Sequence, residues 1–139
     1  MHILFVHQAF PAQFGHIAKY LVDKHGFRCT FVSEKRDGKV AGIERIQYKC
    51  RSGAFEKTHV CSRTFENQIW HSQAVVEALE ARPDVRPDLI VGHSGFASTL
   101  FLRELYDCPI VNYFESFYRT VDSDFDCRHD LPQPERLHA

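Results

Sequence analysis

The sequence predicts an α/β fold, a doubly wound and mostly parallel Rossmann-like sheet with helices on both faces. Residues 2–7 form an apolar run, which is typical of a strand buried on both sides. A second apolar and β-branched run covers residues 27–32. Between the two runs lies a stripe of apolar side chains at helical spacing, formed by Phe14, Ile17, Ala18, Leu21 and Val22. The chain therefore opens as strand, helix and strand, the first unit of such a sheet.

The length and composition fit one globular domain. The chain has 139 residues, of which 44% are hydrophobic and 25% charged. A chain of this size can bury a core of its own without a disulfide or a metal ion. The formal net charge is −1, so the bulk charge gives no reason to expect a nucleic-acid partner.

The cysteines and the hydropathy pattern predict a cytoplasmic location. The five cysteines are scattered without a C-x-x-C pair, and Cys29 and Cys108 lie in or beside strand-like runs, so we expect buried, reduced thiols. The sequence shows no secretory signal. No segment approaches the ~20 consecutive apolar residues that cross a bilayer.

The first half of the chain predicts one helix and three strands. The helix covers about residues 12–25, because Pro11 suits the position before a helix and Gly26 suits a left-handed helix end. The three strands, of which the third has the polar residues of an edge strand, cover about residues 2–7, 27–33 and 43–49.

The second half predicts two further helices and two further strands after an irregular segment. A long helix over about residues 64–82 has Thr64 as a candidate N-cap. Its apolar side chains share one face and are Phe65, Ile69, Val76 and Leu79. A strand, a helix and a last strand are predicted over about residues 88–93, 97–106 and 109–114. Beyond Glu115 the pattern fades, so residues 116–139 are expected to form an interdomain segment or tail.

The carboxyl end of the first strand is the first candidate site. Ligands of doubly wound sheets bind beyond the carboxyl ends of the strands, which places His7, Gln8 and Gly15 at the functional edge. Gly15 opens a helix, where unpaired amides welcome an anion, but it equally suits close packing of helix on sheet. No G-x-G-x-x-G or P-loop motif is present, which disfavours dinucleotide binding and P-loop chemistry.

The end of the fourth predicted strand offers a second candidate. Residues 92–96 read Gly-His-Ser-Gly-Phe, which resembles the nucleophile elbow of serine hydrolases with Ser94 as nucleophile. The last glycine of that motif is missing, and only His129 and His138 follow as candidate bases. The favoured interpretation is that His93 is a polar group lining a cleft, and the alternative that it only caps the end of a buried strand stays open.

Residues 113–119 offer a third candidate, in which Glu115 and Arg119 lie among aromatic side chains. Aromatic faces with a few polar groups suit sugars, and arginine suits phosphate. A hydrophobic plug with one surface ion pair explains the same residues equally well. The acidic residues of segment 122–126 lack the glycine and glutamate of a calcium loop, so we expect no metal and no cofactor.

Four segments resemble one family in the same order along the chain. Residues 2–16, with the opening Ile-Leu-Phe-Val-His-Gln-Ala-Phe-Pro-Ala-Gln-Phe, are similar to the amino terminus of a bacterial subgroup of glycosyltransferase family 4. Residues 73–75, 86–95 and 113–119 match the same subgroup. The resemblance implies a GT-B enzyme with two Rossmann-like domains, of which residues 1–139 form the amino-terminal, acceptor-side one. The carboxyl-terminal donor domain, with its E-x₇-E signature, is absent from this sequence.

The resemblance also implies roles for individual residues. His93 and Glu115 are the expected catalytic residues, although many relatives have a histidine at the place of Glu115. The residues expected to bind substrate or the donor phosphates are His7, Gln8, Gln13, Gly15, Ser94 and Arg119.

The implied reaction is transfer of a sugar from a nucleotide-sugar donor to the hydroxyl of a sugar or lipid-linked acceptor. It is expected to proceed with retention, without a metal, and in the full-length parent rather than in this fragment. The resemblance is compatible with peripheral association of the parent with a membrane. Two alternatives stay open, a self-contained serine hydrolase that uses Ser94 and a non-catalytic α/β binding module.

Overall fold

A computed structural model describes residues 1–35, 38–95 and 99–115 of the chain. The predicted tail 116–139, with Arg119, His129 and His138, lies outside the described residues. The elements, in chain order, are β1 (His2–Val6), α1 (Gly15–His25), β2 (Arg28–Ser33), β3 (Ile43–Gln47), α2 (Val60–Glu80), β4 (Leu89–His93), η1 (Leu102–Glu104) and β5 (Ile110–Tyr113).

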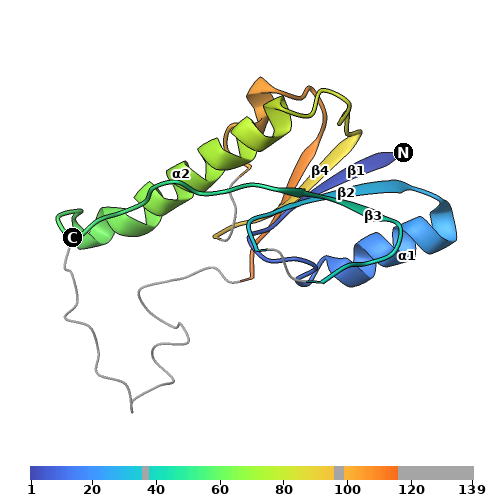
Figure 1. The fold of residues 1–139 in the computed structure, drawn as a ribbon, viewed down its shortest axis with the longest axis horizontal. Coiled ribbons are helices and arrows are strands. Elements are labelled where there is room, and N and C mark those ends of the chain that lie inside the picture. The colour runs from blue at the N-terminus through green and yellow to red at the C-terminus, as the bar shows by residue number, and fades with distance from the viewer. Residues whose placement is uncertain (36–37, 96–98, 116–139) are drawn as a thin grey trace, which may run out of the picture.

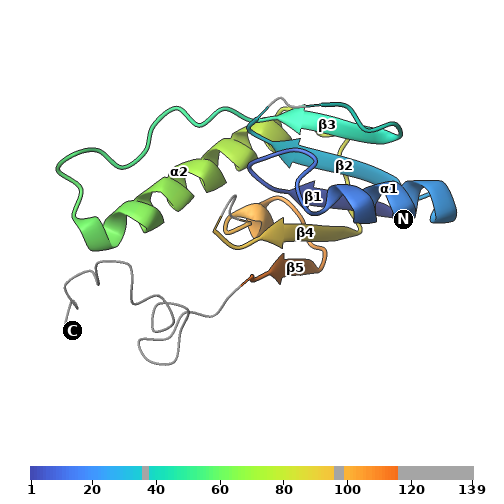
Figure 2. The same cartoon turned by 90° about the horizontal axis from the view of Figure 1, so that it is seen from below.

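Within the described residues, one sheet of five parallel strands has the order β3-β2-β1-β4-β5 (Figure 2). β1 pairs with β2 on one side and with β4 on the other, with Val6 opposite both Val32 and Gly92. α1 covers one face of the sheet and α2 covers the other (Figure 1). The predicted α/β doubly wound fold is confirmed, and its strand order is the one found in Rossmann-like sheets.

Alternation along the strands builds a separate core on each face. On the α2 side, Leu4 and Val6 of β1 pack with Val75 and Leu79 of the helix. On the α1 side, the core consists of Ile3, Phe5, Phe10, Phe14, Ala18, Cys29 and Phe31. Because successive side chains of a strand point to opposite faces, the apolar run of β1 fills both cores, and every residue of this central strand is buried.

The helix α1 starts at Gly15, later than predicted. Ala12 has a φ of 45°, which lies in the left-handed region and cannot continue a right-handed helix. The predicted stop is confirmed, because Gly26 has a φ of 63° and its amide donates to the carbonyls of Leu21 and Val22.

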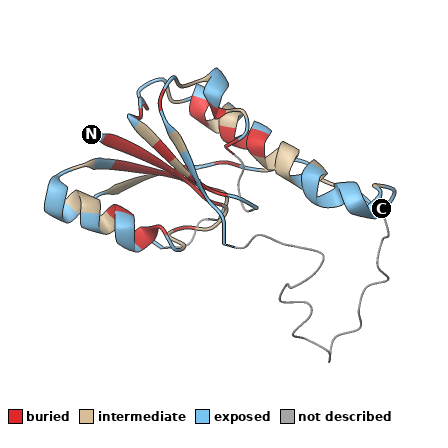
Figure 3. Cartoon of the chain, turned by 180° about the vertical axis from the view of Figure 1, so that it is seen from behind, coloured by how far each residue is buried: buried red, intermediate tan, exposed pale blue. Residues whose placement is uncertain are grey.

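The helix α2 starts at Val60, before the predicted Thr64 cap. The side chain of His59 caps it by accepting a hydrogen bond from the amide of Cys61 at 3.2 Å. Of the apolar side chains predicted to share one face of this helix, Phe65 is 62% exposed, whereas Leu79 is buried. The first half of α2 extends beyond the sheet and is mostly exposed, whereas its second half packs on the sheet (Figures 1 and 3).

The predicted helix over residues 97–106 was wrong for its described part. Residues 99–106 contain only the short 3-10 helix η1. Its turns close through i to i+3 bonds, such as the one from the amide of Leu102 to the carbonyl of Thr99 at 3.0 Å. The side chain of Thr99 is held to Asn112 of β5 at 2.8 Å, and this tie anchors the segment as a tight loop.

Two further findings concern membranes and thiols. No helix in the described part of the chain has the length and hydrophobicity to span a bilayer. Cys29 and Cys108 are free and buried, as predicted.

The buried His2 gives folding a pH dependence. Its ring nitrogens contact the carbonyl oxygen of Arg86 at 3.0 Å and the hydroxyl of Thr30 at 2.8 Å. Burial lowers the pKa of His2 below its ordinary value, and the positive charge of Arg28 lowers this pKa further. The folded chain therefore binds a proton on His2 less readily than the unfolded chain does.

We expect the free energy of unfolding to decrease as the pH falls below about 6.5, the ordinary pKa of histidine. Stability is fully present above that pH and is lost towards the lowered folded-state pKa, by at most about 1.4 kcal/mol per pH unit for each such histidine. Urea unfolding between pH 8 and 5 measures the slope, and His2→Gln should reduce it. An unchanged slope in this variant would contradict the assignment.

Candidate functional site

The candidate site lies where the strand order of the sheet reverses, between β1 and β4. A doubly wound sheet opens a crevice at this point, outside the carboxyl ends of the strands. His7 follows β1 directly, and His93 is the last residue of β4. Their rings lie 5.3 Å apart between centroids at an angle of 82°, so two histidines predicted from separate motifs meet at one point.

Aromatic rings surround this histidine pair. Phe14, in the turn before α1, lies edge-on to His7 with ring centroids 6.0 Å apart. Tyr113, the last residue of β5, lies 5.4 Å from His93. Tyr113 is placed there by the register of the sheet, since it is the partner of His93 across β4 and β5. Aromatic rings interspersed with polar atoms suit a sugar, because its apolar C–H faces stack on the rings and its hydroxyls form hydrogen bonds with the polar atoms.

Glu115 brings a carboxylate to this cluster. Its Oε1 lies 3.5 Å from Nε2 of His93, and the carboxylate side chain is 56% exposed while that of His93 is 2% exposed. A buried imidazole is thus connected to solvent through an acidic group. Such a pair can hold or move a proton at the Nε2 atom, and the structure brings together the two residues expected to be catalytic.

His7 contributes a fixed imidazole. Its Nδ1 lies 2.9 Å from the amide nitrogen of Ala9, from which it can accept a hydrogen bond. Burial lowers the pKa of His7, and the nearby His93 lowers it further, whereas the charge of Glu115 acts in the opposite direction. His7 therefore favours the neutral form in the folded chain.

Gln8 belongs to a second polar cluster at the same edge of the sheet. Its Nε2 lies 3.2 Å from Oε2 of Glu34 and 3.3 Å from Nε2 of His71. The Nδ1 of His71 lies 3.1 Å from the hydroxyl of Tyr48. The side-chain amide of Gln8 donates to Glu34, and the ring of His71 links Gln8 to Tyr48.

Three members of this second cluster were missed by the sequence analysis. Glu34 and Tyr48 directly follow the ends of β2 and β3, so the same carboxyl-end rule would have pointed to them. Nothing in the sequence marks His71, which lies within α2. Tyr48 is buried, and this burial raises the pKa of its hydroxyl above the ordinary value.

Gly15 has a packing reason for being glycine. A Cβ added there would lie 2.6 Å from Cβ of Pro11, which is closer than two carbon atoms can approach. This geometry favours the packing interpretation. The first turn of α1 contains no acidic residue, so its amides are also compatible with an anion.

The remaining candidates are exposed or lie outside the described residues. Gln13 and Ser94 are exposed, and the amide of Ser94 donates to the carbonyl of Tyr113 at 2.9 Å. Arg119 and the acidic segment 122–126 lie outside the described residues. Within the part of the chain that is described, no group of three or more His, Cys, Asp or Glu residues gathers as a metal site would require.

Comparison with known proteins places this geometry in context. A family profile described as "Glycosyl transferase family 4 group" matches residues 25–139. A search of curated proteins found no match.

Among solved structures, CalG4, the calicheamicin glycosyltransferase, is 25% identical with a TM-score of 0.52, and the match covers 90% of this chain and 35% of that one. Apo UGT2 of Phytolacca americana is 14% identical with a TM-score of 0.54, and the match covers 84% of this chain and 29% of that one. The chain thus spans about a third of the length of these two structures.

Proposed function

Since the chain belongs to the glycosyl transferase family 4 group, we propose that it forms the amino-terminal, acceptor-side domain of a GT-B glycosyltransferase. The enzyme moves a sugar from a nucleotide-sugar donor to the hydroxyl of a sugar or lipid-linked acceptor. The observation that carries this proposal is the cluster of His7, His93 and Glu115 at the switch point of the sheet, lined by aromatic rings.

His93 and Glu115 carry the chemistry on this side of the cleft. The exposed carboxylate of Glu115 accepts a hydrogen bond from the hydroxyl that reacts, and the Nε2 of the buried His93 shares the proton that the carboxylate takes up. His7, whose ring lies 5.3 Å from that of His93, holds this imidazole in place. The amides at the start of α1, together with Gln13, Ser94 and Arg119, bind the departing diphosphate in this proposal and stabilise its charge.

The transfer is proposed to retain the anomeric configuration and to need no metal ion. Closure of the donor domain over this edge excludes water, so that the acceptor hydroxyl rather than water attacks the sugar.

The proposed lipid-linked acceptor agrees with one surface of the domain. Phe55, Val60 and Phe65 are exposed around the start of α2, and the exposed cations Lys57 and Arg63 lie within the same segment. Apolar and basic side chains together suit the surface of an anionic membrane, and we propose peripheral association of the full-length protein. The free thiols of the described cysteines agree with a cytoplasmic location.

The test is a transfer assay on the full-length protein that contains this chain. Incubation with a panel of nucleotide-sugars and hydroxyl acceptors should release nucleoside diphosphate above a hydrolysis blank and give a product heavier by one sugar. The isolated 139-residue chain should show no turnover, since a GT-B donor is bound mainly by the other domain. Proton NMR of the product checks retention, and activity in EDTA checks metal independence.

One additional reagent distinguishes the proposed sugar transfer from the serine hydrolase alternative. A fluorophosphonate probe should leave Ser94 unlabelled, because the sequence after it lacks the last glycine of the elbow. Labelling of Ser94, together with no release of nucleoside diphosphate, would replace the proposed function by hydrolysis.

A further inference from the structure

We infer that Arg45 and Lys39 form a binding site for a phosphate group, on the α1 face of the sheet and outside the cluster of His7, His93 and Glu115. The inference does not depend on the proposed sugar transfer. It rests on an arginine whose charge the described protein residues leave unbalanced, and on the hollow that this arginine lines.

Arg45 occupies a half-buried position on the edge strand β3. Its guanidinium carbon lies 5.4 Å from the centre of the Phe10 ring. The ring holds the planar guanidinium group by a cation–π contact but provides no acceptor for its N–H groups. The Nη1 atom is buried without a hydrogen-bond partner. Among the described residues, Arg45 takes part in no ion pair.

Two other arginines of the domain, unlike Arg45, have carboxylate partners. Arg28 and Arg82 both pair with Glu44 and with Asp84. Glu44 is next to Arg45 in the sequence, but adjacent residues of a strand point to opposite faces. The neighbouring carboxylate is therefore committed to the other side of the sheet. The charge of Arg45 therefore has no carboxylate partner among the described residues, and an anion bound at the remaining N–H groups of the guanidinium would balance it.

A hollow of about 740 Å³ lies in front of this guanidinium group. Lys39, which is exposed, brings a second positive charge to its wall, and none of the described residues that line the hollow is acidic. The remaining wall is largely apolar and includes Val40, Ala41 and Ile43. The volume falls in the range of small-molecule sites, so it has room for a phosphate group and the body that carries it.

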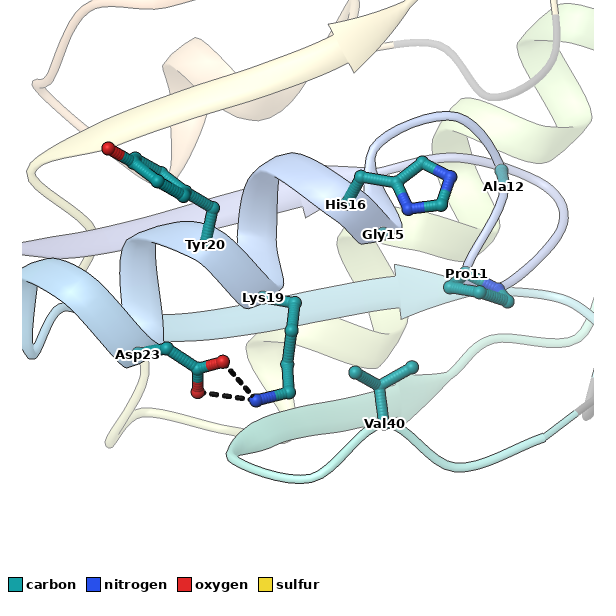
Figure 4. A pocket seen from close by; sticks show the side chains of 8 residues that line it. All are labelled: Pro11, Ala12, Gly15, His16, Lys19, Tyr20, Asp23 and Val40. Carbon is teal, nitrogen blue, oxygen red and sulfur yellow. Dashed lines mark hydrogen bonds and ion pairs between the residues drawn. The ribbon is translucent and has the colours of Figure 1, made fainter.

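In the neighbouring hollow along α1, the lysine of the wall is already paired with a carboxylate. This hollow measures about 480 Å³ and shares Val40 with the first hollow. Figure 4 shows its cation, Lys19, paired with Asp23 on the same helix. Because this charge is already balanced, the second hollow has no comparable demand for an anion, and the proposal is confined to the hollow of Arg45.

Phosphate fits the pair of cations better than a carboxylate does. A planar guanidinium group binds two oxygens of a tetrahedral anion side by side, while a lysine ammonium acts as a point charge on a third. The contact with the Phe10 ring holds the guanidinium group in one orientation, so less conformational entropy is lost when an anion binds.

The test is a titration of the 139-residue chain with inorganic phosphate at constant ionic strength, followed by proton–nitrogen NMR. We expect saturable shifts of the Arg45 side-chain Nε–H signal and of the backbone signals around Lys39. Arg45→Met should weaken the affinity about tenfold or more. Lys39→Gln, which changes an exposed residue and leaves the fold intact, should weaken it roughly two- to fivefold. Arg28→Gln is the matched control and should leave the affinity unchanged.

Vesicles of phosphatidylcholine with phosphatidylglycerol separate the two sources of a phosphate group. If the wild-type chain sediments with these vesicles and the Arg45→Met variant does not, the site is assigned to a lipid headgroup. Saturable phosphate shifts without such sedimentation would assign it to a phosphorylated small molecule. The proposal is overturned if the wild-type chain shows neither saturable phosphate shifts nor sedimentation with the vesicles. It is also overturned if Arg45→Met and Lys39→Gln bind phosphate as tightly as wild type does.

Discussion

Replacement of Gly92 by alanine is expected to lower the free energy of unfolding by about 2–4 kcal/mol. Gly92 lies buried in β4, and a Cβ there would be 2.3 Å from Cγ2 of Thr99 and 2.8 Å from Oδ1 of Asn112. These two side chains are hydrogen-bonded to each other. The added methyl group must therefore displace the link between the loop before η1 and β5, or bend the strand that ends at His93.

Thermal and urea unfolding of the chain measure this loss, which corresponds to a fall in Tm of roughly 10 °C. Thr99→Ser removes the nearest methyl group, so it should recover part of the stability when combined with Gly92→Ala. The single Thr99→Ser variant is the control for the loss of that methyl group alone. A Gly92→Ala chain as stable as wild type would show that this region repacks freely.

If the full-length protein is the proposed glycosyltransferase, replacement of His93 by glutamine in it is expected to reduce kcat/KM by about a hundredfold. Glutamine keeps a polar side chain of similar reach but cannot take up a proton. The loss should appear mainly in kcat, because a proton held at Nε2 stabilises the transition state more than the bound substrate. The Tm of the variant checks that the packing with Phe14 and Tyr113 survives.

Glu115→Gln separates chemistry from packing, because this side chain is exposed and lies 3.5 Å from His93. We expect kcat to fall about tenfold without a change in Tm, and the pH profile of kcat to shift. Glu80→Gln, at the far end of α2, is the matched control, since it removes an exposed carboxylate at the opposite edge of the sheet. Full activity of both His93→Gln and Glu115→Gln would remove these residues from the catalytic site.

Part of the candidate site was predictable because parallel strands bring their carboxyl ends to one edge. His7 and His93 each follow an apolar run, and Glu115 follows a third, so the rule for doubly wound sheets places all three together. The strand order adds what the sequence lacks, since it makes β1 and β4 direct neighbours. That neighbourhood brings the two imidazole rings into contact.

The errors of prediction have local physical causes. The start of α1 depends on the left-handed backbone conformation of Ala12, and an alanine in a sequence does not indicate such a conformation. The start of α2 depends on a cap by the histidine side chain of His59, a residue outside the usual capping set. The segment before β5 is held by Thr99 and Asn112, and a tie between separate elements leaves no periodicity in the sequence.

The sequence by itself determined the fold class, the central strands and the edge at which the site lies. These follow from short-range patterns, because burial on both faces requires continuous apolar runs and a packed helix requires a stripe. Only the tertiary structure decided which side chains meet across long separations. Gln8 and His71 are 63 residues apart, and Arg45 meets Phe10 rather than the carboxylate next to it. Such contacts depend on register and on the face a strand presents, and these are settled when the sheet assembles.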